Sequence, residues 1–167
     1  MKRPTLKLTP ASGLMRNEHF QVAYATNDID KARDVFGTRY GIKAFRRLEG
    51  GLPAGGNIRI ELAWVGTVMY ELLTAEGPGS DIYMYRIPEG SDFVIRHHHL
   101  GYMIHDQQAW EGLDVDAERS GCRVLHKNCT PGFMSSSFIE TPELGHLLEY
   151  LFPEQAGIDF FEGVPNN

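Results

Sequence analysis

Two glutamates stand inside apolar runs of this 167-residue sequence, where a negative charge is costly to bury. Glu71 lies within residues 68–73 and Glu149 within residues 146–152, and both runs are typical of buried β-strands. A carboxylate in such a position loses its hydration, so it needs a hydrogen-bonding partner or a bound cation. These two runs are therefore candidates for a chemical site.

The positions of the two glutamates repeat along the chain. A shift of 78 residues carries Glu149 onto Glu71, and the same shift places residues 97–106 on residues 19–28. In each half, 50 residues separate the glutamate from a polar residue in an earlier strand. Four polar side chains thus recur in matching positions: Gln21 with Glu71, and His99 with Glu149. Repetition of this kind favours two related modules.

The first half of the chain predicts the order strand, helix, strand, strand, strand. A strand over residues 19–26 leads to a helix that Asn27 or Asp28 caps and that Gly41 ends. A strand over residues 42–48 follows. Two antiparallel strands joined at Gly66 complete this half.

The second half predicts the same order. Its first strand covers residues 97–104, and one helix then runs from Asp106 to Ser120, with Gly121 as its stop. Three strands around residues 122–126, 134–140 and 146–152 complete it. The expected fold class is α+β, with two tandem βαβββ modules.

The predicted boundaries divide the chain into five parts. An N-terminal arm covers residues 1–18, and the modules cover 19–75 and 97–152, with a linker over 76–96 and a tail over 153–167. The linker holds Ile82, Tyr83 and Ile87, so we do not expect a solvated tether. Packing across the outside of a sheet is favoured over the alternative, a lid on a pocket. The apolar tail is expected to cover a subunit or module surface.

Composition excludes several classes of partner. The chain has 16 basic and 22 acidic residues, a formal charge of −6 and no basic stripe, so nucleic acid and anionic membranes are not expected partners. No apolar run approaches the roughly 20 residues that a membrane span needs. With two cysteines, Cys122 and Cys129, and no signal peptide, we expect a cytoplasmic protein with free thiols.

Three segments carry a resemblance to a known family. They are residues 20–24 leading to 28–32, residues 99–102 leading to Asp106, and residues 141–146 leading to 148–150. With the paired βαβββ pattern, they resemble the vicinal oxygen chelate superfamily, which includes glyoxalase I and methylmalonyl-CoA epimerase. The resemblance covers residues 19–152. It implies a cupped mixed β-sheet that holds one divalent metal ion, and often a homodimer.

The resemblance also implies the ligands of that ion. Carried over position by position, they are Gln21, Glu71, His99 and Glu149, a set similar to that of the glyoxalase I of animals. Two carboxylates, an amide oxygen and an imidazole suit Zn, Mn, Co, Ni or Mg, and Fe less well. Such an ion would polarise a carbonyl or stabilise an enolate. Either Glu149 or Glu71 would be the catalytic base, and the symmetry of the repeat does not choose between them.

Neighbouring histidines compete for two of these positions. Alternation along the strand places His97 on the same face as His99 and turns His98 away. His19 competes with Gln21 in the same manner, and the repeat does not separate the pairs because both differ by 78. The family's spacing to the following helix favours Gln21 and His99.

These features predict a metal-dependent isomerase, epimerase or lyase of the glyoxalase type that acts on a small carbonyl or thioester substrate. One alternative is an extradiol ring-cleaving dioxygenase, which requires two histidines and one carboxylate around iron. The other is a metal-free protein of the same fold that binds a small molecule. The first hypothesis requires a divalent metal ion, the second requires iron, and the third requires no metal.

Overall fold

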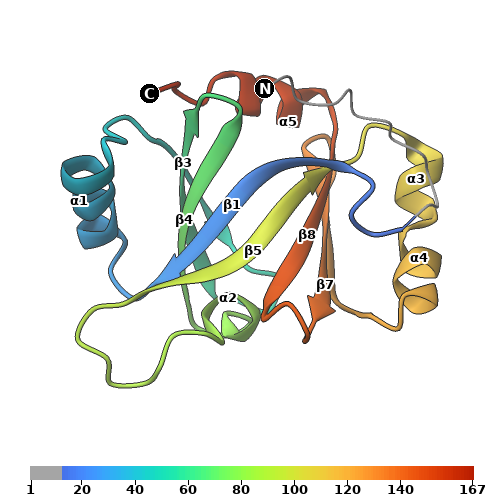
Figure 1. The fold of residues 1–167 in the computed structure, drawn as a ribbon, viewed down its shortest axis with the longest axis horizontal. Helices are drawn as coiled ribbons and strands as arrows, with labels where there is room; N and C mark the ends of the chain where they lie inside the picture. Colours follow the sequence, from blue (N-terminus) through green and yellow to red (C-terminus); the bar gives the residue numbers. More distant parts are fainter. Residues whose placement is uncertain (1–12) are drawn as a thin grey trace. The chain divides into compact units, whose positions relative to one another are not determined.

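The computed structural model describes residues 13–167, so most of the expected arm over residues 1–18 lies outside the described part. Eight strands form one mixed sheet in the order β2-β3-β4-β1-β5-β8-β7-β6 (Figure 1). In chain order the elements are β1 (Glu18–Thr26), α1 (Ile29–Tyr40), β2 (Arg46–Gly51), β3 (Asn57–Val65), β4 (Val68–Glu76), α2 (Asp81–Met84), β5 (Ile95–Met103), α3 (Gln107–Glu111), α4 (Leu113–Arg119), β6 (Arg123–Thr130), β7 (Met134–Thr141), β8 (His146–Pro153) and α5 (Gln155–Glu162).

The chain folds into two compact units. Unit 1 contains residues up to Phe20 together with Leu100–Asp159, and unit 2 contains Gln21–His99 together with Phe160–Asn167. Strands β1 and β5 each begin in one unit and end in the other. The element order repeats as the sequence predicts, while the five sequence boundaries, with modules at 19–75 and 97–152, stay a prediction.

Helix α1 in unit 2 begins and ends where its capping residues predict. The Asp28 carboxylate accepts a hydrogen bond from the Lys31 backbone N–H at 2.9 Å, which satisfies one free donor of the first turn. Gly41 ends the helix with φ of 80°, a conformation that costs glycine little. The buried face of α1 packs on β3 and β4 through a cluster formed by Ile29, Ala32, Phe36, Ile42, Ala63 and Leu72.

The linker covers the opposite face of the unit 2 sheet. Tyr83 and Ile87 pack against Ala23 of β1 and Leu73 of β4. Ala23 shares its strand face with Gln21, because side chains two residues apart on a strand point the same way. The expectation that the linker packs on the outside of the sheet is therefore wrong: it packs on the face that carries the candidate ligand.

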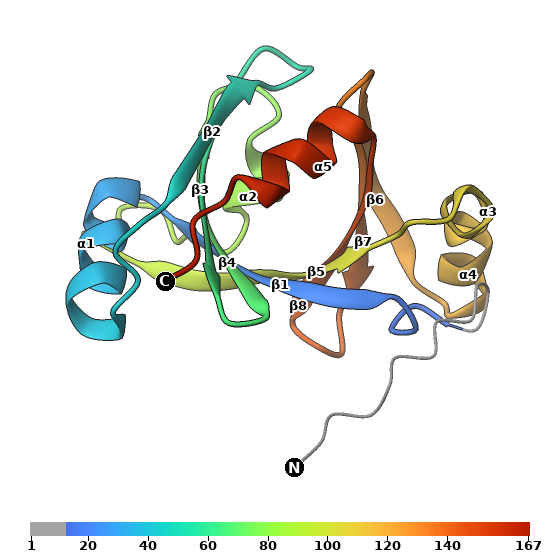
Figure 2. The ribbon, with the colours of Figure 1, turned by 90° about the horizontal axis from the view of Figure 1, so that it is seen from above.

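Unit 1 contains two short helices where the sequence predicts one. Asp106 caps the start as expected, accepting from the Ala109 backbone N–H at 2.8 Å. The helix then breaks at Gly112 into α3 and α4, since glycine is a poor helix former. Leu113 and Ala117 of α4 are buried in a core with aromatic residues of β5 and β8. Figure 2 shows α3 and α4 together beside β6.

The end of the chain packs on β2 and β3 within unit 2. The Arg46 guanidinium donates to the carbonyl oxygen of Phe160 at 2.9 Å, and the Trp64 backbone N–H donates to that of Pro165 at 2.8 Å. The two contacts tie the last turn of α5 and the segment after it to strands more than a hundred residues earlier. The tail thus contributes to the stability of this unit.

Candidate metal centre

Three of the four predicted ligands are buried in unit 2. Gln21 is 1%, Glu71 5% and His99 1% exposed, which is unusual for side chains that strongly prefer water. They come from β1, β4 and β5, and β1 lies between the other two strands in the sheet. The parallel pairing of β1 with β4 places Ala23 opposite Glu71, so Gln21 projects from the same face as the glutamate.

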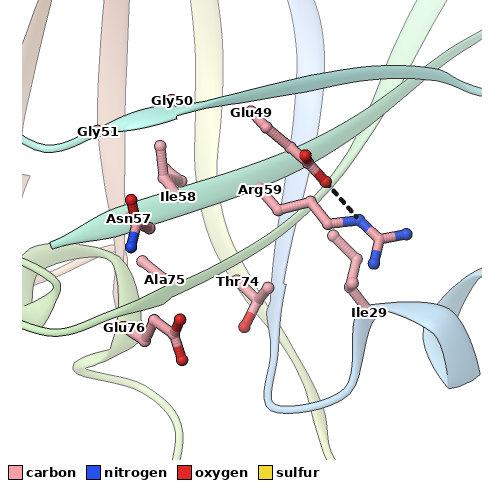
Figure 3. Close-up of a pocket in the computed structure, with 10 residues that line it drawn as sticks. All are labelled: Ile29, Glu49, Gly50, Gly51, Asn57, Ile58, Arg59, Thr74, Ala75 and Glu76. Carbon is pink, nitrogen blue, oxygen red and sulfur yellow. Dashed lines mark ion pairs between the residues drawn. The ribbon is translucent and has the colours of Figure 1, made fainter.

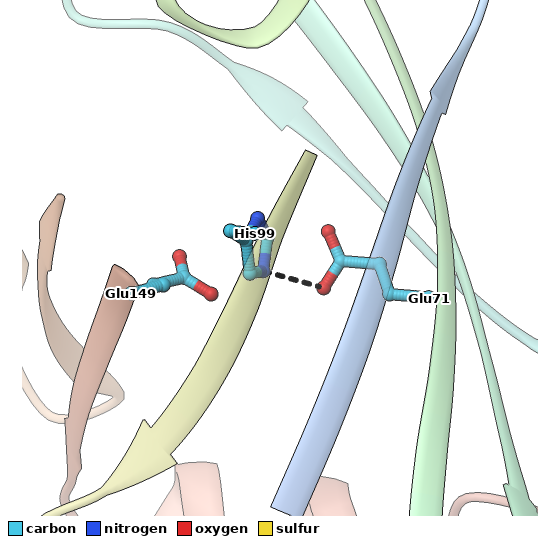
Figure 4. Close-up of side chains that lie close together, drawn as sticks. All are labelled: Glu71, His99 and Glu149. Carbon is cyan, nitrogen blue, oxygen red and sulfur yellow. Dashed lines mark ion pairs between the residues drawn. The ribbon is translucent and has the colours of Figure 1, made fainter. Parts of the chain in front are cut away.

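The Glu71 carboxylate is the centre of this group. Its Oε2 atom accepts a hydrogen bond from the Gln21 side-chain amide. The same oxygen lies 3.9 Å from His99 Nε2, and the two side chains point toward each other (Figure 4). An amide, a carboxylate and an imidazole therefore meet in a buried, polar group.

Glu149 lies on β8 in unit 1 and is partly buried. It pairs with Phe138 of β7, so the two side chains occupy the same face of that pair of strands. The ring of His126 on β6 lies 6.5 Å from the Phe138 ring. Glu149 thus lies beside an aromatic side chain, Phe138, on its strand face.

The competing histidines lie elsewhere. His97 contacts Tyr24 at a ring distance of 5.8 Å, on the face covered by α1. The prediction that His97 shares a face with His99 is therefore wrong. His19 is exposed, and its ring lies 5.3 Å from Tyr102 in unit 1. These positions leave Gln21 and His99 as the better candidates in their strands.

The prediction that the His98 side chain points away from the site is wrong. It is fully buried, and its Nδ1 lies 2.8 Å from His99 Nδ1. Its other nitrogen, Nε2, lies 2.9 Å from the carbonyl oxygen of Ile82 in α2. Burial lowers the pKa of His98 to about 3, and the neighbouring His99 contributes to the shift. The physical reason for the error is that β5 departs from regular alternation here, so consecutive rings come together.

The donor types of the buried group fit a divalent cation. Imidazole nitrogen and carboxylate or amide oxygen are ligands that Zn, Mn, Co and Ni accept in proteins. The Gln21 side chain donates through its amide nitrogen to Glu71, and its amide oxygen is the donor atom of the type that a divalent ion accepts. The residues present are therefore suited to the predicted metal.

Unit 2 also contains a cluster of charged side chains that the sequence does not predict. Glu61 on β3 is 1% exposed and accepts hydrogen bonds from Arg47 Nε at 2.9 Å and Arg59 Nη2 at 2.8 Å. Arg33 Nε lies 3.7 Å from its other oxygen. The arginines come from separate elements, so no local motif predicts the cluster. Only the register of β2 with β3 and the position of α1 bring them together.

A cavity of about 570 Å³ lies next to this cluster, on the side of the sheet that faces α1. Figure 3 shows the residues around it, with the Glu49 and Arg59 pair at one end: Ile29, Glu49, Gly50, Gly51, Asn57, Ile58, Arg59, Thr74, Ala75 and Glu76. Gln21 and Glu71 occupy the opposite face of the sheet. The cavity is therefore separate from the candidate ligands.

No protein-family profile matches the sequence, and no curated protein matches it. Solved structures do match. A variant of Streptomyces coelicolor methylmalonyl-CoA epimerase in complex with 2-nitronate-propionyl-CoA gives a TM-score of 0.60 at 17% identity, over 84% of this chain and 96% of that one. The Mycobacterium tuberculosis methylmalonyl-CoA epimerase gives 0.60 at 15%, over 85% and 91%. A hypothetical protein from Bacillus halodurans gives 0.57 at 15%, over 83% and 96%.

The chain has the vicinal oxygen chelate fold. The mixed sheet of eight strands and the structural neighbours confirm both the fold class and the resemblance predicted from the sequence. Identities this low establish the fold alone, because one fold supports many functions. Among the described residues, no helix is long and apolar enough to cross a membrane, and both cysteines are free.

Proposed function

We propose that this chain is a divalent-metal-dependent isomerase, epimerase or lyase of the glyoxalase type, acting on a small carbonyl or thioester substrate. The observation that carries the proposal is the buried group of Gln21, Glu71 and His99, which meet at one carboxylate oxygen. Burial of three such side chains together costs desolvation free energy that hydrogen bonds or a bound cation must offset, and groups of this kind are common at functional sites. The fold and its structural neighbours support the choice of reaction class.

We propose Gln21, Glu71, His99 and Glu149 as the ligands. Glu71, His99 and Glu149 carry the carboxylate and imidazole donors of such a site (Figure 4). The 78-residue repeat supports Glu149, since it is the counterpart of Glu71 in the other half. A bound divalent ion would act there as a Lewis acid toward the substrate oxygen.

Of the two glutamates, we assign the role of base to Glu149. Glu71 is almost fully buried and its carboxylate accepts the Gln21 amide, so it is held in place and shielded. Glu149 is only partly buried, and a general base must come within hydrogen-bonding reach of the substrate proton. In this proposal Glu149 removes a proton from the carbon next to the carbonyl and returns it to the same or a neighbouring carbon.

The structural neighbours favour a thioester among the possible substrates. The Streptomyces epimerase was solved with 2-nitronate-propionyl-CoA, and another epimerase with methylmalonyl-CoA. The proton next to a thioester carbonyl is acidic enough for a carboxylate base to remove with electrophilic assistance. We therefore propose an acyl-CoA or a similarly activated small molecule as the substrate class.

The positions of the histidines favour the isomerase over the dioxygenase. An extradiol site requires a second imidazole ligand. His97 lies on the α1 face and His19 is exposed beside Tyr102, while the two ring nitrogens of His98 face His99 and Ile82. The metal-free binding protein becomes the leading hypothesis if no metal is taken up. The homodimer and the cytoplasmic location stay predictions of the sequence.

Hydrogen exchange at the substrate carbon tests this function. The chelator-treated protein is reloaded separately with Zn, Mn, Co, Ni or Mg and incubated in D₂O with methylmalonyl-CoA or with a glutathione hemithioacetal, while proton NMR follows the reacting C–H. We expect exchange with at least one metal and one substrate. Glu149→Gln should slow it at least about 100-fold, because a general base contributes about that much or more.

The control is Glu143→Gln, which removes an exposed carboxylate from the turn between β7 and β8. It should exchange the substrate proton at the wild-type rate. Exchange that is unaffected by Glu149→Gln would contradict the assignment of the base. Metal uptake without exchange of either substrate would contradict the proposed reaction.

A further inference from the structure

The linker holds His98 from three directions. The Ile82 carbonyl oxygen lies 2.9 Å from His98 Nε2. The Tyr83 ring stacks on the imidazole at 6.4 Å, with 14° between the planes, and the Tyr85 ring meets it edge-on at 5.5 Å. A residue clamped in this way has one ring orientation. Its second nitrogen is thereby aimed at His99 Nδ1, 2.8 Å away.

This chain of contacts determines where the protons lie. A carbonyl oxygen only accepts hydrogen bonds, so His98 Nε2 must carry the proton that is shared with Ile82. A neutral imidazole has one protonated nitrogen, and His98 Nδ1 is therefore an acceptor. His99 Nδ1 must then donate across the 2.8 Å contact. The lone pair of His99 consequently resides on Nε2, the nitrogen that faces Glu71 Oε2.

Burial supports the neutral state of His98. Its ring is fully buried beside a second buried imidazole, and a positive charge there would lose its hydration and repel any charge on His99. The hydrogen-bond geometry and the burial thus lead to the same protonation state.

We propose that His98 is a positioning residue, anchored by the linker, that fixes the His99 proton on Nδ1 and so presents the Nε2 lone pair to a divalent metal ion. The inference rests on the proposed metal function and adds the linker to it. Histidine ligands commonly donate their second N–H to an outer partner that fixes the tautomer. Here the outer partner is another histidine, itself held by the Ile82 carbonyl.

The tautomer can be measured directly in metal-free protein. Long-range proton–nitrogen NMR correlations on protein labelled with ¹⁵N-histidine distinguish protonated from unprotonated ring nitrogens, and His99→Gln identifies the signals of His99. We expect wild-type His99 to carry its proton on Nδ1. A wild-type spectrum with the His99 proton on Nε2 would overturn the proposal, whatever the metal content.

Two variants of His98 separate the hydrogen bond from packing. In His98→Asn the side-chain oxygen replaces Nδ1 as an acceptor, so the His99 tautomer should be kept and Co²⁺ affinity should stay within about threefold of wild type. In His98→Phe a ring of similar shape remains between Tyr83 and Tyr85 but accepts no such bond. His99 should then populate the Nε2–H form, with Co²⁺ affinity about 10–100-fold lower.

Wild-type tautomer and affinity retained in a folded His98→Phe protein would contradict the positioning role. If circular dichroism shows that this variant does not fold, the wild-type spectrum and His98→Asn still decide the question. Failure of wild-type protein to take up Co²⁺ would contradict the proposed metal function. The spectrum of the metal-free protein tests the tautomer independently of that result.

Discussion

The Gln21 side-chain amide donates a hydrogen bond to the Glu71 carboxylate, between two parallel neighbouring strands of the sheet. Fifty residues separate the two positions along the chain. Both side chains are buried, and Glu71 also faces His99. This contact is the centre of the proposed metal site. The pairing of β1 with β4 holds the two side chains in place.

Replacement of Glu61 by Gln should strongly destabilise the protein. The buried carboxylate accepts hydrogen bonds from Arg47 and Arg59, and an amide in its place removes the buried negative charge and turns an NH₂ group toward a guanidinium. We expect a decrease of about 3 kcal/mol in the free energy of unfolding. Glu49→Gln is the matched control, since Glu49 contacts the same two arginines but its side chain is 54% exposed. It should cost at most about 1 kcal/mol. Equal effects in urea unfolding would contradict this account.

Gly56→Ala should disrupt the end of the β2–β3 hairpin. A Cβ atom at this position would lie 2.4 Å from the Glu76 carbonyl oxygen and 2.6 Å from that of Pro78, so the backbone would have to shift. We expect a loss of about 1–3 kcal/mol. Gly50→Ala, in β2, meets nothing within 4 Å and should be neutral or slightly stabilising. Thermal unfolding distinguishes the two, and a Gly56→Ala protein as stable as Gly50→Ala would be inconsistent with this packing.

Tyr150→Phe should loosen the segment that precedes β1. The buried Tyr150 hydroxyl donates to the Leu14 carbonyl oxygen at 2.7 Å, and its ring stacks on Tyr102. The substitution keeps the stack and removes the hydrogen bond, at an expected cost of about 1–2 kcal/mol. Trypsin should cleave faster after the exposed Arg16. Tyr40→Phe, at an exposed position, serves as control, and cleavage at the wild-type rate in Tyr150→Phe would refute the anchoring role.

Asp30 should make stability depend on acid pH. The hydrogen bond from Arg59 holds the pKa of Asp30 below its usual value. A carboxyl group whose pKa is lowered by folding contributes stability above its unfolded pKa of about 3.9, and loses it as the pH falls through the folded pKa. The stability difference between wild type and Asp30→Asn should therefore shrink on acidification and vanish below the folded pKa. A difference that stays constant over this pH range would exclude the mechanism.

The fold could be predicted from the sequence because its signals are local and repeated. Of the two predicted caps, Asn27 and Asp28, Asp28 is the one used, and the predicted stop at Gly41 and the turn at Gly66 are both correct. The 78-residue repeat located the strands of both halves. The predicted strand over 42–48 was placed early, since β2 covers Arg46–Gly51. Residues 42–45 instead follow the helix as a connection without regular structure.

Two parts of the candidate site could not be predicted. Strict alternation assigned His97 and His99 to one face, but β5 is irregular at the three histidines, and His98 contacts His99 instead. The linker carbonyl of Ile82 that orients His98 comes from a segment without any chemical motif. The three adjacent histidines at 97–99 indicate a chemical site in the sequence. They do not indicate which ring faces which partner. Long-range packing decides that.

Metal binding tests the central claim most directly. Chelator-treated wild-type protein is titrated with Co²⁺, Mn²⁺, Ni²⁺ or Zn²⁺ by calorimetry, beside Glu71→Gln, Glu149→Gln and the exposed control Glu143→Gln. We predict about one ion per chain for wild type and the control, with affinity at least about 10-fold lower in the other two. Absence of uptake by wild type, or equal affinity in Glu71→Gln, would contradict the metal centre proposed around Glu71.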